Sequence, residues 1–187
     1  MMSIILPDYN EPNLELVKRE ISTLFPDAEV IVISDTQGKG KGWAIREGFS
    51  RASGGIIVFL DADMDIHPRM INRLLPFLED YDVVVGTKRI EEGLLSRKIL
   101  TFLSRIYIRI LFGISVDTQT GIKLFKRWTI RPWKTNGYAF DIEILYHAKK
   151  LKCRMIEVPI DANIKRRMSW KPILKTLKES IKLRWFL

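Results

Sequence analysis

Apolar, largely β-branched residues gather in short runs along the first half of the chain, and segments with helical spacing separate these runs. The runs lack polar alternation, which predicts strands covered on both faces, at residues 3–6, 29–34, 56–60 and 82–86. Helical spacing predicts helices at about 13–25, 43–52 and 68–78. The alternation predicts an α/β fold with a mostly parallel, doubly wound sheet and helices on both faces.

The second half adds basic amphipathic segments to this pattern. Residues 94–112 alternate large apolar residues with Arg and Lys, which predicts a helix that either packs on the core or lies on an anionic membrane. A strand at 121–126, a helix at 141–151 and a strand at 155–158 are expected next. Proline is expected to end both the first strand, at Pro7, and the last, at Pro159. The chain closes with a basic loop and an amphipathic helix over 166–187.

Composition narrows the classes of protein. A chain of 187 residues, 47% of them hydrophobic, predicts one folded domain. We find no signal peptide and no apolar run near the roughly 20 residues that span a bilayer, so a cytoplasmic protein is expected. The net charge of +9 suits anionic lipid or phosphorylated small molecules. No nucleic-acid partner is expected, because the basic residues do not frame a recognisable binding fold.

Three carboxylates, Asp61, Asp63 and Asp65, follow the third predicted strand directly. They could form a turn, a divalent-cation site or a pair of catalytic acids. Alternate residues on extended backbone share a face about 6–7 Å apart, and Mg²⁺ or Mn²⁺ takes one or two carboxylates together with substrate phosphates. Asp35 and residues 8–11 also follow strands, so acidic groups converge where doubly wound sheets bind ligands.

The glycine-rich stretch GKGKGWAIREG, residues 38–48, opens a predicted helix. It lacks the Walker spacing, because no Gly-Lys-Ser/Thr closes it. Backbone N–H groups at a helix start can still receive a phosphate, with Lys41 as a candidate ligand. A plain flexible turn is the alternative.

A set of motifs runs in one order across nearly the whole chain: LPDYNE, Asp35, GKGWAIREGFSRASGGIIVFLDADMD, VVVGTKR, SRKIL, VDTQTGIKLFKR, FDIEIL, IEVPI and KRRMSWK. Together they resemble the family 2 glycosyltransferases of the GT-A fold, specifically the polyprenyl (dolichyl) phosphate mannose/glucose synthases. The resemblance implies a nucleotide-sugar half over about 1–92 and an acceptor half over 93–165, followed by the C-terminal loop and helix.

The resemblance also implies roles for individual residues. Donor-binding residues are expected to be Pro7, Tyr9, Glu11, Asp35, Lys41 and Asp61. Asp61 and Asp63 match the DxD motif that carries Mg²⁺ or Mn²⁺, and Asp65, which stands where many relatives have Gln, is the expected third ligand. Residues expected at the acceptor phosphate are Lys88, Arg97, Thr101, Arg166, Arg167, Ser169 and Lys171. The expected catalytic residues are Asp63, Asp117 and Arg97.

The implied activity is inverting, metal-dependent transfer of a hexose to a polyprenyl phosphate by an enzyme held peripherally on the inner face of the cell membrane. Mannose from GDP-mannose is the expected donor sugar, and UDP-glucose is the near alternative. Relatives carry a helix and a strand between Asp35 and the glycine-rich loop that are missing here, which removes part of the base-binding wall. Most relatives also continue into membrane helices, so a separate membrane subunit is a candidate partner. A sugar nucleotidyltransferase and a non-catalytic membrane-binding module are the other classes considered.

Overall fold

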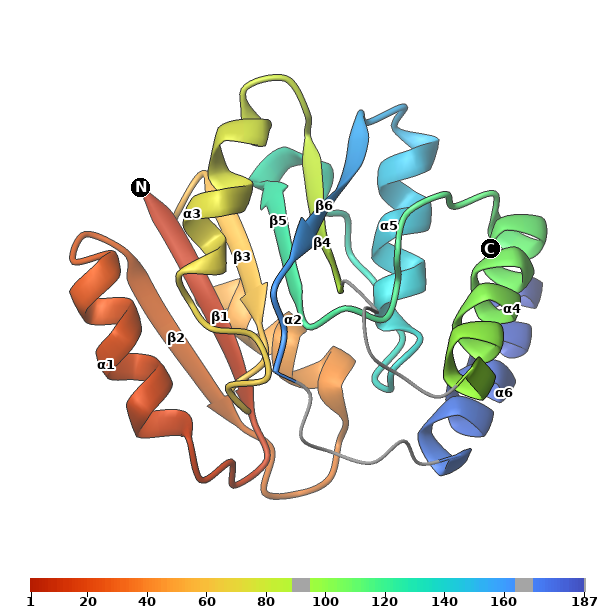
Figure 1. The fold of residues 1–187 in the computed structure, drawn as a ribbon, viewed down its shortest axis with the longest axis horizontal. Helices are drawn as coiled ribbons and strands as arrows, with labels where there is room; N and C mark the ends of the chain where they lie inside the picture. The colour runs from red at the N-terminus through yellow and green to blue at the C-terminus, as the bar shows by residue number, and fades with distance from the viewer. Residues whose placement is uncertain (89–94, 164–169, 187) are drawn as a thin grey trace.

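A six-stranded sheet in the order β2-β1-β3-β5-β4-β6 forms the centre of the molecule (Figure 1). The computed structural model describes residues 1–88, 95–163 and 170–186, with side chains for all of these except 88, 95–101 and 170–175. The strands are Met2–Asp8 (β1), Glu29–Ser34 (β2), Ile56–Leu60 (β3), Val83–Lys88 (β4), Ile122–Lys126 (β5) and Met155–Ile160 (β6). Neighbouring strands are parallel except at β5, which runs antiparallel to β3 and β4.

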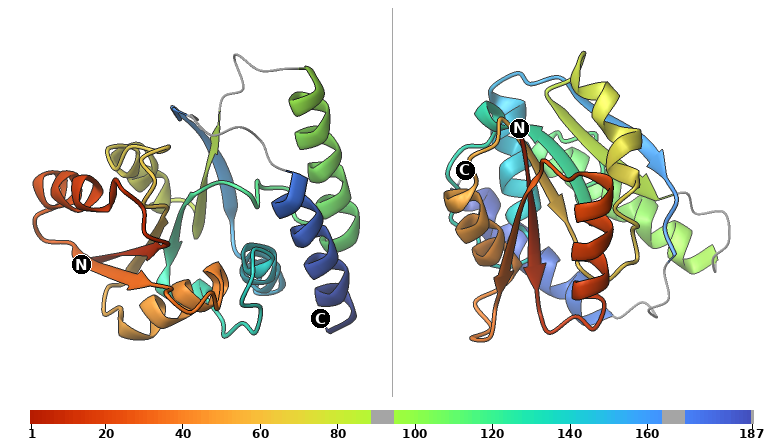
Figure 2. Two further views of the ribbon diagram at one scale, coloured as in Figure 1. Left: turned by 90° about the horizontal axis from the view of Figure 1, so that it is seen from below. Right: turned by 90° about the vertical axis from the view of Figure 1, so that its left-hand side faces the viewer.

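Helices cover both faces of this sheet. They are Leu14–Leu24 (α1), Lys41–Arg51 (α2), Met70–Leu74 (α3), Leu95–Phe112 (α4), Phe140–Lys150 (α5) and Trp170–Phe186 (α6). Helices α1 and α3 pack on one face, and α2 and α5 pack on the other. Helices α4 and α6 lie side by side beyond α5 (Figure 2), joined by a 3.0 Å hydrogen bond between the Tyr107 and Ser180 hydroxyls. The predicted α/β architecture is confirmed.

Strand residues alternate between two apolar cores. Ile4 of β1 packs with Ile21 of α1, whereas its neighbour Ile5 packs with Ile45 of α2. Successive side chains on a strand point to opposite faces, so a strand buried on both sides has to be apolar throughout. This burial accounts for the unbroken apolar runs in the sequence.

Three boundary predictions were wrong, all of them at prolines. Pro7 lies inside β1, where the strand pairs only with β2 because its pairing with β3 ends at Ile5. Pro159 lies inside β6, an edge strand, and edge strands tolerate a missing N–H group. The helix expected at 68–78 is a short α3 followed by the 3₁₀ helix Leu75–Leu78, because Pro76 cannot continue α-helical hydrogen bonding.

Candidate active site

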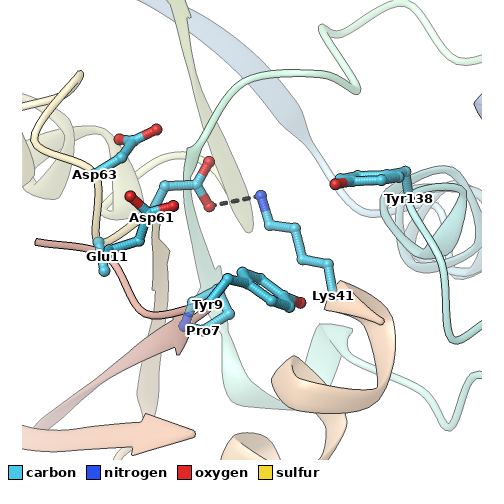
Figure 3. A pocket seen from close by; sticks show the side chains of 8 residues that line it. Pro7, Tyr9, Glu11, Lys41, Asp61, Asp63 and Tyr138 are labelled. Atoms are coloured by element: carbon cyan, nitrogen blue, oxygen red, sulfur yellow. Dashed lines mark ion pairs between the residues drawn. The ribbon is translucent and has the colours of Figure 1, made fainter. Parts of the chain in front are cut away.

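A pocket opens at the carboxyl ends of β1 and β3, the edge of the sheet where ligands are expected. Its volume is roughly 250 Å³. It is lined by Pro7, Tyr9, Glu11, Lys41, Asp61, Ala62, Asp63 and Tyr138 (Figure 3). Six of these residues were predicted from the sequence, and the fold brings them together from three separate segments.

Asp8 was expected at the ligand-binding edge of the sheet without a role of its own, and it shapes the first of these segments. Its carboxylate accepts hydrogen bonds from the Glu11 backbone N–H at 2.9 Å and from the Ser34 hydroxyl at 2.8 Å. Asn10 takes a left-handed conformation, with φ at 61°. The resulting turn places Tyr9 and Glu11 at the pocket. Burial raises the pKa of Tyr9 although Lys41 lowers it, so the phenol is protonated at neutral pH.

Asp35 organises the glycine-rich loop in this structure. Its carboxylate accepts hydrogen bonds from the backbone N–H groups of Lys39 at 2.9 Å and Gly40 at 2.6 Å. Burial raises the pKa of Asp35, but these N–H groups outweigh burial and hold the pKa below its usual range. Gly40 has φ of 107°, and a Cβ there would lie 2.5 Å from the Asn136 carbonyl oxygen. Asp35 is not among the residues that line the pocket, and its contact with a nucleoside stays a prediction.

Lys41, the first residue of α2, forms an ion pair with Asp61, the first residue after β3. Its Nζ lies 2.5 Å from Asp61 Oδ1, with 16% of the lysine side chain and 31% of the aspartate side chain exposed. Burial lowers the pKa of Lys41, but the carboxylates of Asp61 and Asp141 outweigh it and keep the pKa above its ordinary value. The pocket therefore presents a fully charged ammonium group beside a carboxylate.

The rest of the acidic loop is a turn stabilised by its own side chains. Asp63 Oδ1 accepts the Asp65 backbone N–H at 3.0 Å, and the Asp63 carbonyl accepts Asn13 Nδ2 at 3.0 Å. Asp61 and Asp63 line the pocket, whereas Asp65 does not. In the part of the chain that the structure describes, no three His, Cys, Asp or Glu side chains form a group able to hold a metal ion. The assignment of Asp65 as third ligand stays a prediction.

Two further residues at the site were not predicted. Gly121 packs against Asp61, whose backbone N–H donates to the Gly121 carbonyl at 2.9 Å. A Cβ at Gly121 would collide with the Asp61 carboxylate, so only glycine leaves room for it. Tyr138 lines the pocket across Lys41 from Asp61 (Figure 3). The Asn-Gly pair before Tyr138 was a turn signal that could have drawn attention to this loop.

The predicted acceptor residues are only partly described. Lys88 ends β4 at the same edge as the pocket, and Arg97 and Thr101 lie in the first turns of α4, but their side chains are outside the description. The same holds for Lys171 at the start of α6. Asp117 accepts the Gln119 N–H at 2.8 Å in a turn. The positions of Arg166, Arg167 and Ser169 lie outside the described residues.

Helices α4 and α6 expose large apolar side chains at the end of the molecule. Among the side chains that the structure describes, those exposed by a third or more include Phe102, Leu103, Ile106, Ile110, Leu177, Ile181, Trp185 and Phe186. Basic residues, among them Arg109, Lys178 and Arg184, share these helices. No helix within residues 1–88, 95–163 and 170–186 has the length and apolarity to cross a membrane.

The chain is similar to known glycosyltransferases over most of its length. The model of the family "Glycosyl transferase family 2" matches residues 4–130. An undecaprenyl-phosphate mannosyltransferase of Micrococcus luteus is 26% identical over 83% of this chain and 81% of its own. A dolichyl-phosphate beta-glucosyltransferase of Dictyostelium discoideum is 30% identical over 73% of this chain, and a dolichol-phosphate mannosyltransferase of Pyrococcus furiosus is 28% identical over 96%. The chain spans about half the length of the last two, 47% and 53%.

Solved structures share the fold. Glucosyl-3-phosphoglycerate synthase from Mycobacterium tuberculosis, in complex with Mn²⁺, uridine diphosphate and phosphoglyceric acid, superposes with a TM-score of 0.77 at 22% identity. The match covers 97% of this chain and 76% of that one. The family model covers more than half of the sequence and includes most of β1, all of β3 and the acidic loop. On this ground the chain belongs to glycosyl transferase family 2 and is a glycosyltransferase.

Proposed function

We propose that this glycosyltransferase moves a hexose, mannose from GDP-mannose, onto a polyprenyl phosphate at the cytoplasmic face of a membrane. The observation that carries the proposal is the pocket in which Lys41 and the carboxylates of Asp61 and Asp63 meet at the edge of the sheet. Relatives named as mannosyltransferases of undecaprenyl and dolichol phosphate support this acceptor class.

The donor's diphosphate is the group that this arrangement suits. Lys41 supplies a charged ammonium at the N-terminus of α2, where the helix dipole favours anions. Tyr9 and Glu11 stand on the neighbouring wall with a phenol and a carboxylate that can bind hydroxyl groups of the donor. A nucleotide-sugar in this pocket would thus have the Lys41 ammonium beside its diphosphate and the polar groups of Tyr9 and Glu11 beside its hydroxyl groups.

The residues fit a divalent cation that arrives with the donor. Asp61 and Asp63 offer the oxygen ligands that Mg²⁺ and Mn²⁺ prefer, and two carboxylates suffice when phosphates complete the shell. When bound, the ion would offset the negative charge on the departing diphosphate. Because Lys41 pairs with Asp61, we expect the ion to bind weakly alone and more tightly with the nucleotide.

The acceptor needs little activation from the protein. A phosphate monoester has its second pKa at about 6, so its oxygen is already anionic at neutral pH. Positioning of that oxygen then accounts for much of the rate. We assign an orienting role to Asp117 and the positioning itself to Lys88, Arg97, Thr101, Arg166, Arg167, Ser169 and Lys171. Direct displacement by the phosphate oxygen inverts the anomeric carbon.

The apolar end of α4 and α6 is the surface that we propose to face the membrane. Trp185 and Phe186 are each 86% exposed, and Ile110 is 77% exposed. Aromatic side chains beside basic ones are typical of helices that lie in the headgroup region of anionic membranes. Replacing Trp185 and Phe186 by Ser should release the protein from anionic vesicles in a sedimentation assay, whereas Trp128→Ser, a change of a 55% exposed tryptophan away from these helices, should not.

Calorimetric titration tests the donor assignment. GDP, UDP, GDP-mannose and UDP-glucose would each be titrated with Mn²⁺ and again with EDTA. Tight, metal-dependent binding of GDP-mannose supports the proposal, and transfer of labelled mannose to a polyprenyl phosphate completes it. If none of the four nucleotides binds, the proposed function is wrong and the acidic loop is a structural turn.

UDP-glucose is the second candidate donor. Two observations favour it. Two dolichyl-phosphate glucosyltransferases are 30–31% identical to this chain, and several structures of glucosyl-3-phosphoglycerate synthase, which shares the fold, are complexes with uridine diphosphate. The same titration decides between the donors. Preference for UDP and UDP-glucose would change the donor but leave the pocket and acceptor proposals in place.

A further inference from the structure

The loop at residues 133–139 supplies Tyr138 to the pocket, across Lys41 from Asp61, and helices α2 and α5 hold its first part. The Trp43 backbone N–H, in the first turn of α2, donates to the Asn136 carbonyl at 3.2 Å. Glu143 of α5 accepts the backbone N–H groups of Lys134 at 3.0 Å and Thr135 at 2.9 Å. These contacts fix the first part of the loop, before Tyr138.

A third helix, α6, holds the part of the loop that carries Tyr138. The Glu179 carboxylate accepts the Ala139 backbone N–H at 3.0 Å, just before α5 begins. The same carboxylate packs against Gly137, where an added Cβ would collide with both of its oxygens. Glu179 therefore contacts the residues on either side of Tyr138.

Tyr138 itself belongs to the pocket. Figure 3 shows its ring across Lys41 from Asp61, with the hydroxyl directed toward the ammonium group. The side chain is 43% exposed, so part of the ring can be covered by a ligand. A tyrosine offers an apolar face to a sugar or base and a hydroxyl to a phosphate or sugar oxygen.

We propose that Tyr138 is a donor-binding residue and that Glu179 is a positioning residue that acts through it. Helix α6 then completes the donor site, in addition to presenting Trp185 and Phe186 at the molecular surface. The inference rests on the proposed function, because it takes the pocket to be the site of a nucleotide-sugar. It assigns to α6 a contribution to donor binding that does not depend on lipid.

Four variants test the pair: Tyr138→Ala, Glu179→Ala, Glu179→Gln and the double alanine variant. The dissociation constant of the nucleotide-sugar that the wild type prefers would be measured by calorimetry with Mn²⁺. Each alanine change should weaken binding about tenfold, the effect of one lost aromatic or charge-assisted contact. The double variant should be no weaker than Tyr138→Ala alone, because Glu179 acts through Tyr138.

Two readouts separate positioning from a general loss of structure. Glu179→Gln keeps an acceptor oxygen for the Ala139 N–H and should restore most of the affinity. The KM for the donor should rise in Glu179→Ala while the KM for the polyprenyl phosphate stays unchanged. Lys182→Ala, at an exposed position one turn after Glu179 on α6, is the matched control and should bind like the wild type.

The variant Gly137→Ala tests the contact of Glu179 with the loop in a second way. The added methyl group has to push the Glu179 carboxylate away, so this variant should bind the donor as weakly as Glu179→Ala. In the Glu179→Ala background the same change should cost little more. Equal melting temperatures would show that the fold is retained.

The inference is overturned if Glu179→Ala binds the donor as tightly as the wild type, or if its effect multiplies fully with that of Tyr138→Ala. It is also overturned if Glu179→Gln binds as weakly as the alanine variant. In these cases the wild type still binds its nucleotide-sugar and the proposed function stands. If the wild type binds no nucleotide-sugar, both the inference and the proposed function are wrong.

Discussion

Two lysine–aspartate pairs lie close together in this molecule, and their surroundings differ. Lys41 and Asp61 meet at 2.5 Å with 16% and 31% of their side chains exposed, and both line the pocket. Lys123 of β5 and Asp141 of α5 meet at 2.9 Å with 2% and 10% exposed. Lys123 also donates to the Thr120 carbonyl at 2.6 Å, so its pair is enclosed by protein.

The difference in exposure indicates different roles for the two pairs. Lys41 and Asp61 are accessible to a ligand, whereas Lys123 and Asp141 stabilise the fold. An ion pair that opens on a pocket can exchange its partner for a phosphate or a cation, because water and ligands reach both groups. A buried pair cannot lose one partner without leaving the other charge unsolvated. Burial raises the pKa of Asp141 even though Lys123 and Lys41 lower it, which shows how costly that carboxylate is without them.

The largest expected effect is on catalysis, from Asp61→Asn. Asparagine has nearly the same shape but no charge, so the fold should be retained while transfer falls by about a thousandfold or more. The measurement is transfer of labelled hexose to a polyprenyl phosphate, with circular dichroism to confirm folding. Asp27→Asn, at an exposed position far from the pocket, should leave transfer unchanged. If the Asp61→Asn enzyme transfers hexose at a near-normal rate, the Lys41–Asp61 pair stabilises the fold and is not required for catalysis.

The buried pair should dominate stability. Lys123→Met leaves Asp141 buried without its cation, and we expect the free energy of unfolding to fall by about 3–5 kcal/mol. Lys41→Met should cost less than Lys123→Met, because Asp61 stays partly open to solvent and Asp141 keeps its pairing with Lys123. Urea denaturation of the two variants measures both values. Equal losses of unfolding free energy in the two variants would contradict the distinction between the pocket pair and the buried pair. Adding Asp141→Asn to Lys123→Met should restore part of the lost stability.

The pocket pair also shows where sequence reasoning works. Asp61, Asp63 and Lys41 were predicted because each follows a strand or opens a helix, and parallel strands bring such positions to one edge. The apolar runs likewise predicted the strands, because a strand that is buried on both faces has to consist of apolar residues. Local sequence patterns are sufficient to predict a site residue when the order and direction of the strands alone determine which residues lie near it.

Tyr138 and the buried pair show where sequence reasoning fails. Tyr138 reaches the pocket because Glu143 and Glu179 hold its loop, and those contacts span 8 and 40 residues. Lys123 sits in an apolar strand and meets Asp141 only through packing of β5 against α5. Such long-range side-chain contacts leave no periodic signal. The antiparallel direction of β5 was likewise not predicted, because strand composition does not report direction.

An intermediate effect is expected from Lys41→Met on ligand binding. Loss of one charge-assisted contact to the diphosphate should raise the KM for the donor about 10- to 100-fold. Binding of Mn²⁺ alone should instead become tighter, because Asp61 loses its internal counter-ion. Calorimetry with Mn²⁺ and with the nucleotide-sugar measures both. If both affinities fall together, Lys41 supports the pocket's shape and does not contact phosphate.

The smallest expected effect comes from Asp35, a carboxylate held by backbone N–H groups of the glycine-rich loop. Its pKa is lower in the folded protein than the ordinary value of about 4, so its contribution to stability is present above that pH. The contribution is lost as the pH falls through the folded pKa. Asp35→Asn should therefore be less stable than the wild type at pH 7, with the gap closing at lower pH.

Urea denaturation at a series of values from pH 7 to pH 3 tests this dependence. Protonation of Asp35 removes the charge that its N–H donors favour, so wild type and variant should converge at the acid end. Asp27→Asn should follow the wild type at every pH, since that side chain is exposed. A gap that stays constant across the series would mean that the shape of the Asp35 side chain, and not its charge, holds the loop from which Lys41 enters the pocket.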